Sequence, residues 1–252
     1  MSGHNKWSKI KHQKAKTDAT KNRVFSRASL AIIAAVKEGG SDDPDLNASL
    51  RMAIEEAKKV NMPKDNIKRA IERGTGKGGA GQIEECTYEG YAPGGVALYI
   101  ECMTDNRNRT AGDVRSTLDK NGGNLGEPGS VAYMFNKKGY LEFDAEKASE
   151  DQLMEILIDA GAEDIVNNGD GTISVTCPYQ QLNECIKAAE AAQIAIEKAE
   201  PAMIPETKIE ITEPATAKKI IDLIDKIEDL ADVKDVNANF DISDAVMAQI
   251  SE

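Results

Sequence analysis

The first third of the chain places apolar residues three and four positions apart, the spacing that lines one face of a helix. This pattern covers residues 24–39, 46–61 and 63–74, and glycine or a Met-Pro step ends each run. The seven residues upstream of Val24 could continue the first run. The spacing therefore predicts three amphipathic helices that bury their apolar faces together in one small helical domain.

Residues 74–81 are rich in glycine and poor in apolar side chains. The segment contains Lys77, but Gly78 follows this lysine where a phosphate-binding loop requires Ser or Thr. A predicted helix also precedes the segment, whereas a phosphate-binding loop follows a strand. We interpret residues 74–81 as a flexible linker at a domain boundary.

Beyond the linker, short runs rich in Val, Ile and Tyr alternate in polarity, which is typical of strands. Residues 87–90 and 96–103 predict two paired strands, with Pro and Gly between them. A helix pattern follows at 110–121, and glycines end it. A further strand pattern lies at 131–135.

Residues 140–204 repeat these signals in a recognisable order: strand, helix, strand, strand, helix, strand. The polar run at 167–171 predicts the hairpin turn between the two middle strands. This order is the split βαβ motif. The flanking pieces show the same order interrupted, because a helix pattern at 215–230 and a strand pattern at 233–242 complete it after the insert.

These patterns predict the α+β fold class, with an N-terminal three-helix domain followed by two ferredoxin-like (split βαβ) α+β domains, one inserted in the other. The expected boundaries follow the linker and the nested order. A basic helical domain occupies residues 1–80, a discontinuous α+β domain occupies residues 81–138 plus 205–252, and the inserted α+β domain occupies residues 139–204.

Charge is divided unevenly along the chain. The net charge is −12, yet residues 1–27 carry eight lysines and arginines against Asp18 alone, a local balance of +7. The remaining residues therefore carry −19. A polyanion attracts the basic arm and repels the acidic body, so this division indicates directed binding to nucleic acid.

Within the basic segment, lysines alternate with polar and single aromatic residues. Each ammonium can replace a counterion on a phosphate backbone, and Trp7 or a histidine can stack on an unpaired base. A solvated tail is the alternative interpretation. The density of lysines and the acidic remainder favour binding, and the candidate residues are Lys6, Trp7, Lys9, Lys11, His12, Lys14, Lys16, Lys21, Arg23 and Arg27.

A second candidate lies in residues 104–110, between a predicted strand and a predicted helix. Arg107 and Arg109 could present forked donors to phosphates, because guanidinium geometry matches phosphate oxygens. The structural alternative is a helix-capping loop, in which Asn108 or Thr110 caps the helix and neighbouring charges pair locally.

Other classes of function find little support in the sequence. No apolar stretch forms a secretory signal or approaches membrane-spanning length, so we expect a cytoplasmic protein with no membrane partner. The four cysteines are widely spaced and predict reduced, structural thiols. We find no paired acid and base, nucleophile motif or metal-ligand spacing, and therefore expect no enzyme activity, catalytic residue, metal, cofactor or small-molecule substrate.

Several stretches together resemble one known family, and they span most of residues 3–135. They read GHNKWSKIKHQKAK, FSR, DPDLNASLRMAIEEAKKVNMPKDNIKRAIERGTG, YEGYAPGGVA, TDNRNRT and GGNLGEPGSVAYMF. On these stretches the chain resembles the YebC/PmpR family, which includes mitochondrial translational activators of cytochrome c oxidase. Departures are small: Asn5 stands where a serine is common, and residues 18–27 match loosely.

The resemblance implies a helical first domain and a third domain inserted into the second. It also implies one of two binding roles, either a DNA-binding transcriptional regulator, as bacterial members are commonly described, or a ribosome-associated translation factor. The basic residues of the family motifs match Lys6, Lys9, Lys11, Lys14 and Lys16 in this sequence, together with Arg107 and Arg109.

The composition of the first domain bears on the choice between these roles. Sequence-specific readout of DNA uses Arg, Asn or Gln side chains that reach base edges, whereas this domain offers mostly lysine. Lysine favours contact with the phosphate backbone, as in structured RNA or nonspecific DNA binding. The family description favours transcription. We therefore expect a nucleic-acid-binding regulator of gene expression, with duplex DNA as its partner and ribosomal RNA or the ribosome as the alternative.

Overall fold

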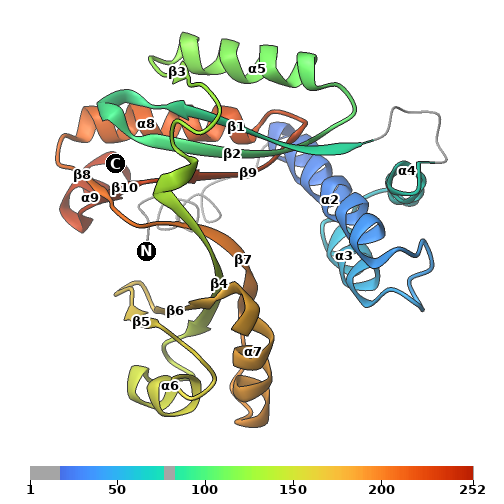
Figure 1. Cartoon of the computed structure of the whole chain (residues 1–252), viewed down its shortest axis with the longest axis vertical. Coiled ribbons are helices and arrows are strands. Elements are labelled where there is room, and N and C mark those ends of the chain that lie inside the picture. The colour runs from blue at the N-terminus through green and yellow to red at the C-terminus, as the bar shows by residue number, and fades with distance from the viewer. Residues whose placement is uncertain (1–17, 77–82, 252) are drawn as a thin grey trace. The chain divides into compact units, whose positions relative to one another are not determined.

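The computed structural model describes residues 18–76 and 83–251 (Figure 1). These residues form two compact units. One comprises Tyr133–Glu210 with Asn239–Asp241, and the other comprises the rest of the described chain. Both units contain helices and strands. The first helices of the chain come before its first strand. The predicted α+β fold class is confirmed.

Three helices open the described chain, as the apolar spacing predicted: α2 (Asp18–Gly39), α3 (Ala48–Lys59) and α4 (Lys64–Gly74). Helix α2 includes six of the seven upstream residues that could continue its pattern, and residue 17 lies outside the described chain. Asn47 caps α3, because its side chain accepts the N–H of Leu50 and donates to the carbonyl of Ala35. The helices share a core whose largest fully buried members are Ile32, Ile33 and Leu50.

A four-stranded antiparallel sheet follows, in the order β3-β1-β2-β9. The strands are β1 (Glu84–Tyr91), β2 (Ala97–Thr104), β3 (Asn124–Leu125) and β9 (Val233–Ala238). The 3-10 turn Pro93–Gly95 joins β1 to β2 as the hairpin that the sequence predicted. Two helices that contact each other, α5 (Arg107–Lys120) and α8 (Pro214–Glu228), pack against this sheet (Figure 1).

The inserted residues form a second four-stranded sheet, in the order β5-β6-β4-β7. Its strands are β4 (Phe135–Asp144), β5 (Asp164–Asn167), β6 (Thr172–Pro178) and β7 (Lys198–Pro205). Helix α6 (Glu150–Leu157) connects β4 to β5, and α7 (Leu182–Ala191) connects β6 to β7 after the 3-10 turn Tyr179–Gln181. Neighbouring strands are antiparallel, and the chain order is the predicted split βαβ motif.

The prediction of a strand at residues 131–135 is wrong. Ala132–Met134 form a 3-10 turn, and the strand that begins at Phe135 belongs to the inserted sheet. The physical reason lies on β1, where the Glu89 carboxylate accepts the backbone N–H groups of Val131 and Ala132. These donors are therefore not available to a neighbouring strand.

The C-terminal region contains two short strands and a last helix. Strand β8 (Ile209–Ile211) pairs with β10 (Phe240–Ile242), and α9 (Asp244–Ser251) follows and contacts α8. Across residues 18–76 and 83–251, no helix has the length and apolar content that crossing a membrane would require.

Candidate nucleic-acid interface

Most of the basic segment predicted to bind nucleic acid lies outside the described residues. Lys21 and Arg23 lie on the first turns of α2. Arg27 is the first predicted contact whose side chain the structure places. The predicted contacts that precede the described chain are Lys6, Trp7, Lys9, Lys11, His12, Lys14 and Lys16.

Arg27 forms an ion pair within the chain. Its Nη2 lies 2.9 Å from Oε2 of Glu228, the last residue of α8. The Glu228 side chain is only 7% exposed, and the Arg27 side chain is 39% exposed. A carboxylate at this depth is stable only beside a cation or hydrogen-bond donors. The Nε of Arg27 is buried as well and donates to no acceptor among the residues that the structure describes. Arg27 is therefore already engaged by the protein.

Arg109 is held by two carboxylates. Its Nη2 lies 2.7 Å from Asp232 and 3.0 Å from Asp105, and its Nε lies 3.3 Å from Asp232. The hydrogen bond to Asp232, followed by the one to Asp105, raises the pKa of Arg109. Asp232 also accepts from the buried hydroxyl of Thr110 at 2.8 Å. The start of α5 is thus tied to the residue just before β9.

The same loop shows how α5 begins. Asn106 is the N-cap, because its side chain accepts the N–H of Arg109 at 3.1 Å. The expectation that Asn108 or Thr110 caps this helix is therefore wrong, although the capping role of the loop is confirmed. Arg107 is 59% exposed and lies 3.8 Å from Glu84, a loose surface pair. Of the two loop arginines, Arg107 is the more accessible to a phosphate.

Helices α3 and α4 present basic side chains that the sequence analysis did not single out. Four of them are exposed and form no ion pair within the described chain: Arg51, Lys58, Lys64 and Arg69. The signal was present in the sequence, because these positions lie off the apolar stripe of each predicted helix. Glu55 and Asp65 are exposed on the same helices, so this surface carries mixed charge.

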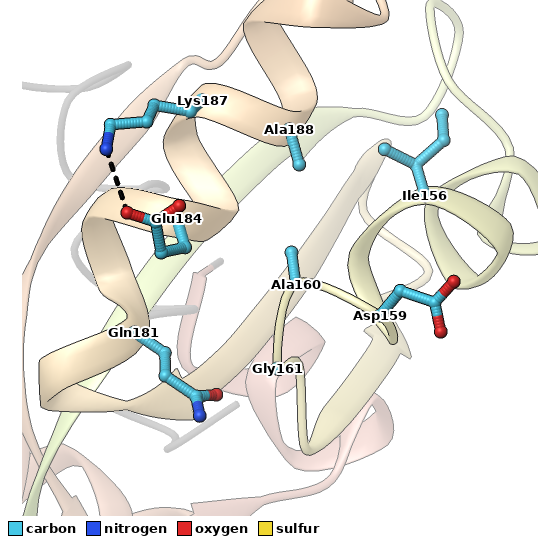
Figure 2. Close-up of a pocket in the computed structure, with 8 residues that line it drawn as sticks. All are labelled: Ile156, Asp159, Ala160, Gly161, Gln181, Glu184, Lys187 and Ala188. Carbon is cyan, nitrogen blue, oxygen red and sulfur yellow. Dashed lines mark hydrogen bonds and ion pairs between the residues drawn. The ribbon is translucent and has the colours of Figure 1, made fainter.

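The inserted domain contains a hollow between α6 and α7, with a volume of about 640 Å³ (Figure 2). Ile156, Ala160 and Ala188 provide apolar walls, and Lys187 pairs with Glu184 at 2.8 Å at its edge. No group of three or more His, Cys, Asp or Glu side chains suited to a metal ion occurs among the residues that the structure describes.

The four cysteines are buried, and none of them is in a disulfide. Cys86 and Cys102 face each other on β1 and β2, and Cys185 lies beside Cys177. Burial raises the pKa of Cys102 and the pKa of Cys185. It raises the pKa of Cys177 to about 12. Because the thiolate is the nucleophile, these three thiols are poorly suited to catalysis.

The chain is similar to known proteins over its whole length. A family model described as the TACO1/YebC protein N-terminal domain matches residues 5–77. A second model, described as the TACO1/YebC second and third domain, matches residues 83–240. These two matches correspond to the helical domain and to the two sheet-containing parts of the fold.

Individual relatives agree with the family models. A probable transcriptional regulatory protein of Maridesulfovibrio salexigens is 47% identical, with all of both chains covered. A protein of Escherichia coli named probable transcriptional regulatory protein YebC is 45% identical over 99% of this chain and 100% of its own. The crystal structure of a conserved hypothetical protein, Aq1575, from Aquifex aeolicus matches with a TM-score of 0.77 and 44% identity, covering 92% of this chain and 94% of that one.

Proposed function

Because the chain belongs to the TACO1/YebC family, we propose that it is a DNA-binding transcriptional regulator whose contact surface is centred on residues 4–27. The observation that carries this proposal is the division of charge, +7 over residues 1–27 against −19 over the rest. The names of the relatives, which call them probable transcriptional regulatory proteins, support a role in transcription.

The ion pairs within the fold reduce the number of basic residues that are candidates for phosphate contact. Arg27 and Arg109 each have carboxylate partners within the chain, so the lysines before α2 are the main candidates for phosphate contact. Exposed basic residues on α3 and α4, such as Lys58 and Lys64, could extend the contact. Lysine contacts position a protein on a backbone without reading bases.

That lysine-rich composition also favours a second candidate function, a translation factor that binds ribosomal RNA. Structured RNA is recognised largely through its shape and its backbone, and lysine suits this kind of contact. Crosslinking in cells, followed by sequencing of the bound nucleic acid, separates the two candidates. Recovery of promoter DNA supports the transcriptional role, and recovery of ribosomal RNA supports the ribosomal one.

The contact surface itself is tested by changing Lys9, Lys11 and Lys14 together to Glu. We expect this variant to lose binding to duplex DNA and to ribosomes, because the phosphate contacts are replaced by repulsion. The matched control changes the exposed residues Lys218, Lys219 and Lys234 to Glu. Both variants shift the net charge from −12 to −18, so only the position of the change differs.

Salt dependence provides the accompanying measurement. If roughly six phosphates are contacted, the logarithm of the affinity for duplex DNA falls with a slope of about −5 against the logarithm of salt concentration. Equal binding by the two triple variants, or a flat response to salt in the native chain, would show that residues 4–27 are not the contact.

A further inference from the structure

Residues 24–29 of α2 have little apolar attachment to the rest of the fold. The side chains of residues 24–29 are only partly buried, and Leu30 is the first buried residue of the helix. Phe25 and Ala28 touch the helical core without being enclosed by it. The ion pair of Arg27 with Glu228 adds a polar attachment to α8 at these turns.

The position of Glu228 makes this attachment specific. It is the last residue of α8, where the partial negative charge of the helix end disfavours a carboxylate and favours a cation. The guanidinium of Arg27 offsets both the buried carboxylate and the helix end. The Nη2 atom of Arg27 lies 2.9 Å from Oε2 of Glu228 at the end of α8.

From this geometry we infer that Arg27 is a positioning residue for nucleic-acid binding, and that it makes no contact with the phosphates. Its pair with Glu228 ties α2, the helix that follows the lysine-rich residues in the chain, to the end of α8. Arg27 lies nine residues into α2, roughly 14 Å along its axis from Asp18. The inference rests on the proposed function, in which those lysines make the contact.

Holding α2 in place matters because every group that must be ordered on binding costs free energy. The body of the protein carries a charge of −19, which repels the same phosphates that attract the arm. The pair holds α2, which follows the contact residues in the chain, against the end of α8 in that acidic body. Loss of the pair therefore weakens binding even when no contact residue changes.

Charge reversal separates positioning from direct contact. Arg27→Glu, Glu228→Arg and the double variant are compared with the native chain for binding to a fluorescently labelled duplex DNA and to a ribosomal RNA fragment. Glu228→Arg makes the chain less acidic, so general electrostatics alone strengthens binding. We expect both single variants to weaken binding about tenfold and the double variant, which restores the pair in reverse, to recover it.

Thermal unfolding of each variant accompanies the binding measurements. A double variant that regains stability without regaining affinity would show that Arg27 touches the nucleic acid, and would overturn the inference. Equal or tighter binding by Glu228→Arg would overturn it too. If a charge-reversal variant fails to fold, Glu228→Gln replaces it, and weaker binding is again expected although a negative charge is lost.

The result that would contradict the proposed function differs from the result that would contradict this inference alone. If the native chain binds neither probe, both the function and the inference fall. If the native chain binds and only the exchange of Arg27 and Glu228 has no effect on affinity, the inference alone falls.

Discussion

Glu89 accepts the backbone N–H of Val131 at 2.7 Å, and this bond fixes the segment that precedes the inserted domain. The same carboxylate accepts the N–H of Ala132 at 2.7 Å and that of Gly129 at 2.6 Å. Glu89 is only 7% exposed. Burial by itself raises the pKa of this carboxyl group, but the three backbone donors outweigh burial and lower it. Glu89 is therefore ionised and bound at neutral pH.

Replacement of Glu89 by Gln should destabilise the fold, because the amide cannot accept all three bonds and carries no charge. We expect a loss of about 2–4 kcal/mol in the free energy of unfolding, measured by urea denaturation. The matched control is Glu85→Gln, at an exposed position on the same strand. Equal stability of the two variants would show that the hydrogen bonds that Glu89 accepts make no net contribution to the free energy of unfolding.

The lowered pKa of Glu89 also predicts how stability responds to acid. A carboxylate whose folded pKa lies below its unfolded value, about 4.3, stabilises the fold above that value. This contribution is lost as the pH falls through the folded pKa. The native chain should thus lose more stability below about pH 4.3 than Glu89→Gln does. Parallel curves of unfolding midpoint against pH would contradict the assignment.

Asp232 joins three parts of the fold and should also be sensitive to substitution. It accepts from Thr104 on β2 at 3.2 Å and from Thr110 on α5 at 2.8 Å, and it pairs with Arg109. We expect Asp232→Asn to cost about 2 kcal/mol, because buried hydroxyl donors and a guanidinium lose their charged acceptor. Asp113→Asn, at an exposed position on α5, is the control.

A double-mutant cycle tests whether Arg109 serves mainly this network. Arg109→Ala and Asp232→Asn are measured singly and together by urea denaturation. If their partnership is the main role of both, the double variant loses less than the sum of the two single losses, by about 1 kcal/mol. Additive losses would mean that Arg109 and Asp232 act independently.

Local patterns were enough to predict helices α2 to α8 and the order of the inserted domain, but the sequence analysis did not predict α9. The apolar stripe of α2 and the polar turn between β5 and β6 depend on residues close together in the chain. The segment 131–135 was different. Val131, Tyr133 and Phe135 alternate as a strand does, but Val131 donates its N–H to Glu89, 42 residues earlier. Such a long-range acceptor leaves no trace in the local pattern.

In the candidate interface, too, the local sequence does not reveal partners that lie far apart in the chain. The sequence identifies Arg109 as a cation in an acidic region, but its partner Asp232 lies 123 residues away. Arg27 has the same property, since Glu228 belongs to the far end of α8. Charge composition predicts where cations are, and only the fold decides which of them are already paired. The role of the lysines before α2 stays a prediction.

Two glycines provide a last prediction, because they differ in the space around them. A Cβ on Gly139 of β4 would lie 2.6 Å from Sγ of Cys177 and 2.9 Å from Cβ of Leu182. Both neighbours are buried in the core of the inserted domain, so the added methyl group must displace packed atoms. We expect Gly139→Ala to cost about 1–3 kcal/mol of unfolding free energy.

Gly112 is the matched position, since a Cβ there would meet nothing within 4 Å. It lies inside α5, where glycine is about 1 kcal/mol less favourable than alanine, so Gly112→Ala should stabilise the protein by roughly that amount. The same change of one methyl group thus acts with opposite sign at the two sites. In calorimetry, a rise in the unfolding temperature of Gly139→Ala would contradict the packing described around Gly139, and a fall for Gly112→Ala would contradict the open space described around Gly112.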